Sequence, residues 1–259
     1  MAVFTATAAT NVDALIGAGD LTLASLLAAT YSNETSSGFT ATTADGLSFE
    51  ISGSGFTYSP PLPLGGIAQE LTALQGSATL WSISGLSVDV VAAVLDPSLL
   101  SPSVVLAGND IINGSRFADN LKGFEGNDLI RGKGGNDTID GGPGNDRLVG
   151  GRGRDHFVFD SALDRHTNVD KIFDFHPAQQ DKIVLSDTIF AGLGPHGTLK
   201  LGHFHNDHAG PSAKPQIIYT QANGLLFYDA NGGHPGGMTH FATLTTHPVI
   251  HNTDFLVVA

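Results

Sequence analysis

Two consecutive stretches of the sequence share one design: Gly141-Gly142-Pro143-Gly144-Asn145-Asp146-Arg147-Leu148-Val149 and Gly150-Gly151-Arg152-Gly153-Arg154-Asp155-His156-Phe157-Val158. Each has glycine at its first, second and fourth positions, aspartate at its sixth and an apolar residue at its eighth. Extended toward the N-terminus, this frame places an aspartate every nine residues, at Asp110, Asp119, Asp128, Asp137, Asp146 and Asp155. Two positions after each comes an apolar side chain: Ile112, Leu121, Ile130, Ile139, Leu148 and Phe157. This nine-residue period decides the fold of residues 108–158.

A repeat of nine residues has a direct structural meaning. The six-residue turn needs glycine where the backbone has a positive φ angle or approaches another group closely. The last three residues form a short strand whose apolar side chain points inward, so two units complete one coil with a strand on each side. We therefore expect units two apart to stack in the same sheet. Ile112, Ile130 and Leu148 should line one sheet, and Leu121, Ile139 and Phe157 the other.

The aspartates of these turns indicate a site for a hard metal ion. Ca²⁺ takes six to eight oxygen ligands, and one turn offers a single carboxylate and a few carbonyls, so stacked turns must share ions. The candidate pairs are Asp110 with Asp128, Asp128 with Asp146, Asp119 with Asp137, and Asp137 with Asp155. Asp128 and Asp137, which are shared between pairs, should matter most. The alternative is a metal-free solenoid or linker, because Gly-Asn-Asp is also an ordinary turn sequence.

The repeated pattern G-G-x-G-x-D-x-U-x, with U apolar, resembles the RTX (hemolysin-type) family of secreted calcium-binding repeats. The resemblance implies a parallel β-roll that binds several Ca²⁺ ions, with backbone carbonyls of the turns as further ligands. It places these at Gly126, Gly135, Gly141, Gly142, Gly144, Asn145, Gly150, Gly151 and Gly153. The early turns depart from the pattern: Gly114-Ser115-Arg116-Phe117-Ala118-Asp119 lacks two glycines, and Phe124 and Lys133 each replace one. These departures weaken the expectation of a site at residues 114–119.

The region after the repeats resembles that of serralysin-type exported proteins. The similar pieces are Phe157-Val158-Phe159-Asp160, Asp170-Lys171-Ile172-Phe173-Asp174-Phe175, Asp181-Lys182-Ile183-Val184-Leu185 and Asp254-Phe255-Leu256-Val257-Val258. This implies export by the type I secretion machinery, which reads a C-terminal signal, and an extracellular location where calcium triggers folding. Residues 1–17 do not read as a signal peptide, which agrees with that route. Asp174 and Asp181 are candidate ligands of a further ion or, equally, turn residues.

The whole chain is predicted to be all-β and in three parts: an N-terminal β-rich module of residues 1–107, the β-roll of residues 108–158, and a C-terminal β cap of residues 159–259. In the first part, residues 39–43 and 47–51 flank the turn Asp45-Gly46 and predict a hairpin. Residues 87–95 predict a helix that ends at Asp96-Pro97. In the third part, residues 192–215 are rich in glycine, histidine and proline and predict a long loop.

Composition excludes several classes of function. The net charge of −13 argues against a nucleic-acid partner, because phosphate binding needs clustered lysine and arginine, and the first 115 residues contain neither. The absence of cysteine excludes disulfides and thiolate metal sites. No stretch approaches the roughly 18 apolar residues of a membrane span.

No catalytic motif is present, so we expect a non-catalytic binding or structural role at a surface, a polysaccharide or a host partner. None of the four glutamates lies near a histidine, so no H-E-x-x-H zinc motif exists, and neither a G-x-S-x-G elbow nor a P-loop occurs. The alternative is an enzyme with an unrecognised site in residues 1–107 that uses the repeats for export. His203, His205 and His208 could bind Zn²⁺ or Cu²⁺, but a polar loop is the favoured interpretation.

Overall fold

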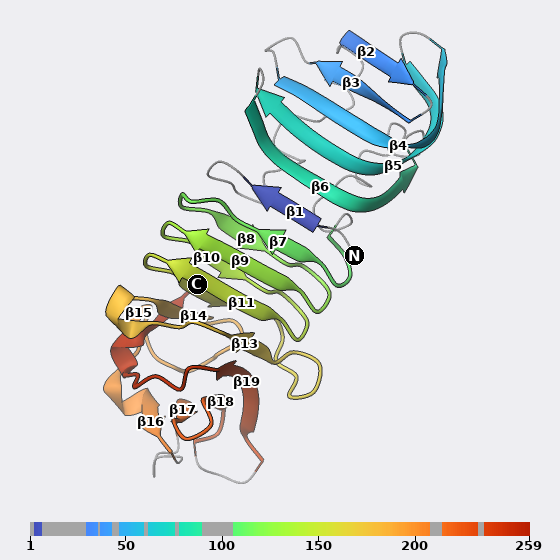
Figure 1. Cartoon of the computed structure of the whole chain (residues 1–259). Coiled ribbons are helices and arrows are strands. Elements are labelled where there is room, and N and C mark those ends of the chain that lie inside the picture. Colours follow the sequence, from blue (N-terminus) through green and yellow to red (C-terminus); the bar gives the residue numbers. More distant parts are fainter. Residues whose placement is uncertain are drawn as a thin grey trace.

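The computed structural model describes residues 3–6, 30–35, 37–42, 47–59, 62–75, 78–89, 106–207, 214–232 and 236–259 (Figure 1). Regular structure in these residues consists of strands and three short 3₁₀ helices, without an α-helix. No helix among them is long and apolar enough to cross a membrane. The predicted all-β fold class is confirmed.

The N-terminal strands form an antiparallel sheet in the order β1-β6-β5-β4-β3-β2. Their bounds are β1 (Val3–Ala6), β2 (Thr30–Thr35), β3 (Gly38–Thr42), β4 (Leu47–Ser59), β5 (Leu62–Gln75) and β6 (Ala78–Asp89). The pairing of β3 with β4 confirms the predicted hairpin. The helix predicted at residues 87–95 is wrong for its first three residues, because Val88 and Asp89 pair with Ala68 and Ile67 of β5. Residues 90–95 lie outside the described part.

The central repeats form two parallel sheets, with one strand from every nine-residue unit. The first contains β7 (Ile111–Asn113), β9 (Leu129–Gly134) and β11 (Arg147–Arg152). The second contains β8 (Asn120–Lys122), β10 (Thr138–Asp140) and β12 (His156–Phe159). The register aligns the apolar residues of units two apart, as predicted: Ile112 with Ile130, Ile130 with Leu148, Leu121 with Ile139, and Ile139 with Phe157. All six of these side chains are fully buried between the sheets.

Both sheets continue beyond the repeats. On the N-terminal side, β1 pairs in parallel with β7. On the C-terminal side, β13 (Asp170–Ile172) and β19 (Met238–Leu244) extend the first sheet, while β14 (Lys182–Ser186) and β20 (Phe255–Val258) extend the second. Figure 1 shows the strands of the roll stacked between the N-terminal and C-terminal strands. The division at residues 107 and 158 stays a prediction, since strand pairing crosses both positions.

Among the remaining C-terminal elements, three strands continue the first sheet beyond β19 and one forms the edge of the second sheet. The remaining elements are η3 (Pro177–Gln179), β15 (Gly197–Thr198), η4 (Leu201–His203), β16 (Phe204–Asn206), β17 (Gln216–Thr220), β18 (Leu225–Asp229) and η5 (Asn252–Asp254). The long loop predicted at residues 192–215 therefore contains three short elements, β15, η4 and β16. Beneath these strands an aromatic cluster continues the core: the ring centroid of Phe241 lies 5.2 Å from that of Phe159 and 5.1 Å from that of Phe190.

Candidate metal centre

The repeat aspartates form two ladders along the roll. In each ladder, carboxylate oxygen Oδ1 accepts a hydrogen bond from the backbone N–H of the aspartate one coil earlier, 18 residues before it. The donor–acceptor distances are 2.7 Å for Asp110 to Asp128, 2.7 Å for Asp128 to Asp146, 2.9 Å for Asp119 to Asp137 and 3.0 Å for Asp137 to Asp155. All six aspartates are buried. The structure therefore brings together each pair that the nine-residue period predicts.

Two further aspartates extend the ladders into the C-terminal strands. The N–H of Asp146 donates to Asp170 Oδ1, and that of Asp155 donates to Asp181 Oδ1, both at 3.0 Å. The prediction did not include Asp170, because an insertion raises the spacing from 18 to 24 residues. The signal that could have identified it is the apolar Ile172 two positions later, which repeats the rule of the earlier units.

Asp174 and Asp181 are already held by backbone donors. Asp174 accepts the N–H of Gly150 at 2.9 Å with one oxygen and that of Gly151 at 2.8 Å with the other. The second oxygen of Asp181 accepts the N–H of His176 at 2.8 Å. Both residues thus lie at the next turn of the roll, and their predicted role as ligands stays a prediction.

The second carboxylate oxygen, Oδ2, has a different environment from Oδ1. In Asp128, Asp137, Asp146 and Asp155 it is buried and makes no hydrogen bond within the described residues. A buried carboxylate oxygen without a partner carries a large desolvation cost. Such an arrangement is stable only when a proton or a cation occupies the place of the missing donor.

Glycine leaves the space that a cation would need. A Cβ atom on Gly123 would meet both Asp128 Oδ2 and the carbonyl oxygen of Gly141, which belongs to the next turn of the same ladder. A Cβ on Gly132 would meet Asp137 Oδ2 and the carbonyl oxygen of Gly150 in the same way. At both places a carboxylate oxygen and a carbonyl oxygen from stacked turns converge. An all-oxygen donor set of this kind suits a hard divalent cation such as Ca²⁺.

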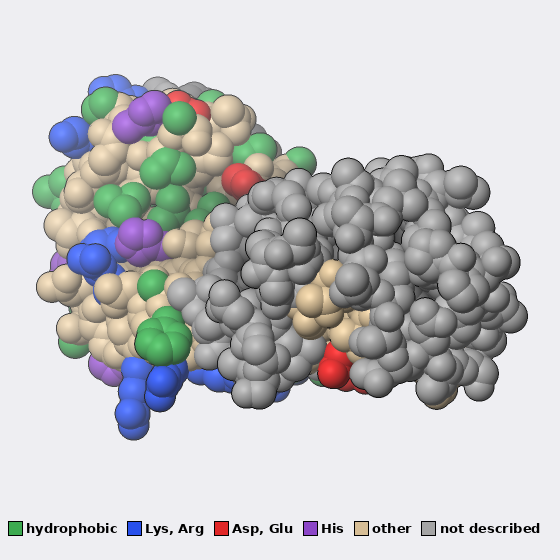
Figure 2. Space-filling view, turned by 90° about the horizontal axis from the view of Figure 1, so that it is seen from above, with side chains coloured by type: hydrophobic (Ala, Val, Ile, Leu, Met, Phe, Trp, Pro, Cys, Tyr) green, Lys and Arg blue, Asp and Glu red, His purple; other side chains and the backbone are tan. Residues whose placement is uncertain are grey.

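Burial shifts the acidity of the ladder carboxylates. Desolvation raises the pKa of Asp128 to about 8, and the neighbouring carboxylates of Asp146 and Asp110 add to the effect. Desolvation also raises the pKa of Asp137 and of Asp146 to about 7, and that of Asp155 to about 6. Figure 2 shows one face of the molecule, on which few acidic side chains are drawn among the described residues. Once ionised, the ladder carboxylates would hold negative charge inside the roll, where it needs a counter-charge.

The turn at residues 114–119 is built differently from its neighbours. Its serine, Ser115, donates both its N–H and its hydroxyl to Asp119 Oδ2, at 2.6 and 2.9 Å. Positive φ angles occur at the second and fourth turn positions in the later units, for example 86° at Gly142 and 154° at Gly144, but at neither Ser115 nor Phe117. Asp119 therefore lies beside Asp137 as predicted, with its second oxygen already bound by a serine.

The histidine segment is only partly a loop. His203 ends η4 and its Nδ1 lies 2.6 Å from the carbonyl oxygen of Pro215, while His205 lies in β16. His208 falls outside the described residues. Within the described part of the chain, no group of three or more His, Cys, Asp or Glu side chains could hold a metal ion. The ladder sites therefore depend on carbonyl oxygens as well as on carboxylates.

Comparison with known families agrees with this geometry. Residues 106–139 and 122–157 match the sequence model of the RTX calcium-binding nonapeptide repeat, in four copies. This chain carries RTX calcium-binding repeats. The matched residues contain both aspartate ladders from Asp110 to Asp155. A comparison with curated proteins finds no match for this chain.

Several solved structures are similar to this chain, including the following three. The R3 subunit of the mannuronan C5-epimerase AlgE6 of Azotobacter vinelandii is 24% identical, with a TM-score of 0.41, over 58% of this chain and 78% of that subunit. The R2 subunit of the same enzyme is 27% identical, with a TM-score of 0.35, over 56% and 91%. The extracellular lipase LipA of Serratia marcescens is 17% identical, with a TM-score of 0.33, over 90% of this chain and 31% of the lipase.

Proposed function

We propose that Ca²⁺ binding to the aspartate ladders triggers folding of the roll outside the cell, and that the protein has a non-catalytic binding or structural role there. The observation that carries the proposal is the set of four buried Oδ2 atoms without a hydrogen-bond partner among the described residues, at Asp128, Asp137, Asp146 and Asp155. Bound Ca²⁺ would supply the positive charge that these oxygens lack.

The proposal assigns two sites, which the positions of carboxylate and carbonyl oxygens beside Gly123 and Gly132 support. Asp128 Oδ2 and the carbonyl of Gly141 would hold one ion, and Asp137 Oδ2 and the carbonyl of Gly150 another. The other turn residues with predicted ligand roles lie in the same stacked turns and would complete the coordination. Oδ1 of each aspartate meanwhile fixes the spacing between coils through its hydrogen bond, so each carboxylate both positions a turn and binds an ion.

Export before folding follows from the calcium requirement. Extracellular calcium modules bind with dissociation constants of roughly 10⁻⁴ to 10⁻³ M, far above the cytosolic calcium concentration that such modules meet before export. In the cytosol the ladder carboxylates would repel one another and oppose closure of the roll. The unfolded chain would then be the substrate of the type I secretion machinery, and the extracellular medium would supply the ions.

The non-catalytic part of the proposal rests on the sequence. The HExxH, GxSxG and P-loop motifs are absent, and the first 115 residues contain no histidine, lysine or arginine to serve as a general base or an oxyanion donor. A surface, polysaccharide or host molecule is the proposed partner. Hydrolysis of a broad panel of ester, peptide and glycoside substrates by the calcium-loaded chain would contradict this part.

The test of the proposed function is a calcium titration of the purified full chain, followed by circular dichroism and calorimetry. We expect a cooperative gain of β-sheet signal with a midpoint of roughly 10⁻⁴ to 10⁻³ M Ca²⁺, and its reversal by a chelator. Mg²⁺ at the same concentration should give a much smaller response, because it prefers a rigid octahedral shell and loses water reluctantly. A chain that shows its full β-sheet signal in chelator would refute calcium-triggered folding.

The stability of the metal-free folded roll should depend on pH through the same carboxylates. Their pKa values lie above the value of about 3.9 for an unfolded aspartate, so the folded roll binds more protons than the unfolded chain between about pH 4 and pH 8. Stability in chelator should therefore fall as the pH rises through this window. We expect a stronger β-sheet signal and a higher melting temperature at pH 5 than at pH 8. In the Asp128→Asn/Asp137→Asn variant this dependence should weaken, and an unchanged dependence would contradict the assignment.

The serine turn gives a separate prediction about the number of ions. The double variant Ser115→Gly/Phe117→Gly restores the glycine pattern at residues 114–119 and removes the hydroxyl that binds Asp119 Oδ2. We expect it to bind one more Ca²⁺ than the wild type, because Asp119 Oδ2 and the Gly132 carbonyl, which both lie beside Gly114, would then resemble the later sites. Isothermal titration calorimetry or atomic absorption after dialysis would count the ions. An unchanged count would show that Ser115 does not exclude calcium.

A further inference from the structure

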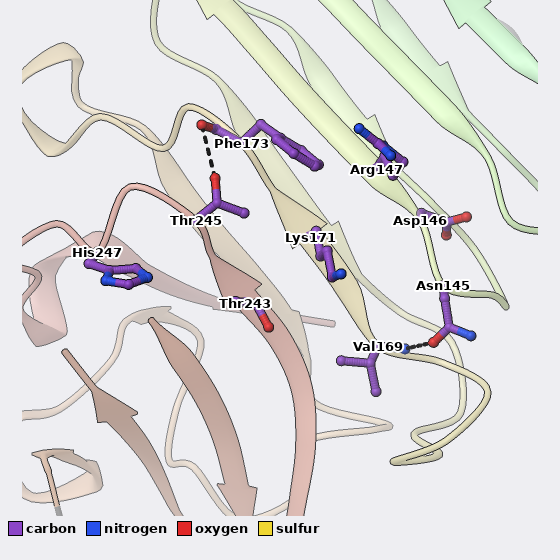
Figure 3. A pocket seen from close by; sticks show the side chains of 9 residues that line it. All are labelled: Asn145, Asp146, Arg147, Val169, Lys171, Phe173, Thr243, Thr245 and His247. Carbon is purple, nitrogen blue, oxygen red and sulfur yellow. Dashed lines mark hydrogen bonds between the residues drawn. The ribbon is translucent and has the colours of Figure 1, made fainter. Parts of the chain in front are cut away.

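A pocket of about 530 Å³ lies on the outer face of the first sheet, and its lining includes Asn145 and the buried ladder residue Asp146. Its lining comes from β11, β13 and β19 and from the segments around them (Figure 3). Arg147 of β11 is the register partner of Lys171 of β13, which is in turn the partner of Thr243 of β19. The side chains of Arg147 and Lys171 therefore stand next to each other on neighbouring strands.

These two cations are in an unusual electrostatic position. Within the described residues, neither forms an ion pair with a carboxylate. Lysines on the second sheet are paired: Lys122 lies 2.7 Å from Asp140, and Lys182 lies 3.9 Å from Asp254. Like charges on directly opposed strand positions destabilise a sheet. In a chain with a net charge of −13, two adjacent and exposed cations without a counter-ion point to an anionic ligand.

The rest of the lining indicates that the anionic ligand would also have an apolar part. The guanidinium of Arg147 lies over the ring of Phe173, 4.8 Å from its centroid, so the arginine is held against the pocket floor. Val169 and the methyl group of Thr243 add apolar surface beside it. This volume lies within the range of small-molecule sites, in which apolar walls surround a few polar groups. His247 lies on the opposite side of the pocket from Arg147 (Figure 3).

We propose that this pocket binds a monocarboxylate with a small apolar body. The carboxylate lies between Arg147 and Lys171 and accepts hydrogen bonds from the guanidinium and the ammonium groups, and the apolar part lies over Phe173 and Val169. Guanidinium and carboxylate have matching planar geometry. Two adjacent cations match one anionic head group. A nucleic acid or another dense polyanion would extend beyond the pocket over a chain of the same charge.

The test uses the full-length chain in calcium, with benzoate and hexanoate as probes and nuclear magnetic resonance titration as the readout. We expect both probes to bind with roughly millimolar affinity, about tenfold more tightly than acetate, which lacks the apolar body, and than benzyl alcohol, which lacks the charge. Benzenesulfonate distinguishes a carboxylate site from a general oxyanion site. Affinity should fall as ionic strength rises, since the site is exposed. Equal binding of benzoate and acetate, or tighter binding of benzenesulfonate than of benzoate, would overturn the proposal.

Variants of the two cations complete the test. Lys171→Gln and Arg147→Gln should each weaken benzoate binding about tenfold, which corresponds to the loss of one charge-assisted hydrogen bond. Lys200→Gln removes the same charge from an exposed position outside the pocket and should bind benzoate like the wild type. The charge-retaining variant Lys171→Arg should keep most of the affinity, and this result separates loss of charge from loss of structure. Wild-type affinity in both glutamine variants would refute the site.

Discussion

The Asp128→Ala/Asp137→Ala variant should lose the cooperative folding response to calcium. Each of these residues supplies one oxygen without a hydrogen-bond partner, Oδ2, and one oxygen, Oδ1, that binds the preceding coil. Both ladders are broken at the same time, because Asp128 belongs to one and Asp137 to the other. We expect the calcium midpoint, followed by circular dichroism, to rise by more than about tenfold or the transition to disappear.

The matched control for this variant removes the same charge elsewhere. Asp164 and Asp187 are aspartates outside the ladders. Asp164 is exposed, and Asp187 forms an ion pair with His196 at the surface. The Asp164→Ala/Asp187→Ala variant should keep the calcium midpoint of the wild type within about a factor of two. If both double variants lost the response equally, the effect would reflect net charge rather than the ladders.

Gly144→Ala should destabilise the calcium-loaded roll strongly, whereas Gly134→Ala should have little effect. Gly144 has a φ angle of 154°, and a Cβ there would overlap the carbonyl oxygen of Gly126 in the stacked turn. The strained backbone alone costs on the order of 1–3 kcal/mol, and the overlap with rigid backbone adds to it. At Gly134 an added Cβ would meet nothing nearer than 3.7 Å, at the carbonyl oxygen of Arg152.

Thermal unfolding in saturating calcium measures this difference. We expect the melting temperature of Gly144→Ala to fall by several degrees or more, as a loss of about 2 kcal/mol implies for a domain of this size. Gly134→Ala should melt close to the wild type. Equal melting temperatures for the two variants would show that the close contact between stacked turns is absent in solution.

The period of nine residues made the roll predictable from sequence. A fixed repeat determines which residues stack, so the sequence predicts both sheets, their register and the pairing of aspartates 18 residues apart. The nine-residue period does not predict Asp170, because an insertion after residue 158 places it 24 residues after Asp146 instead of 18. The helix predicted at residues 87–95 was wrong at Val88 and Asp89 because pairing with β5 outweighs local propensity.

Other features depend on details that a pattern does not contain. Ser115 binds Asp119 in a turn that lacks the left-handed backbone of Phe124 and Lys133, which have φ angles of 66° and 75°. The sequence shows that Ser115, Phe124 and Lys133 each replace a glycine. It does not show which of the three turns has a different backbone conformation. The neighbouring placement of Arg147 and Lys171 likewise depends on a strand register that crosses an insertion.

The hydrogen bonds of the ladders give the roll a direction. Every coil offers an N–H group whose acceptor belongs to the coil that follows, and the final acceptors are Asp170 and Asp181. A fragment that ended at residue 158 would leave the N–H groups of Asp146 and Asp155 without these acceptors. In a one-dimensional array, stability is a sum of nearest-neighbour terms, so we expect loss of the C-terminal strands to destabilise the last coils of the roll more than the first.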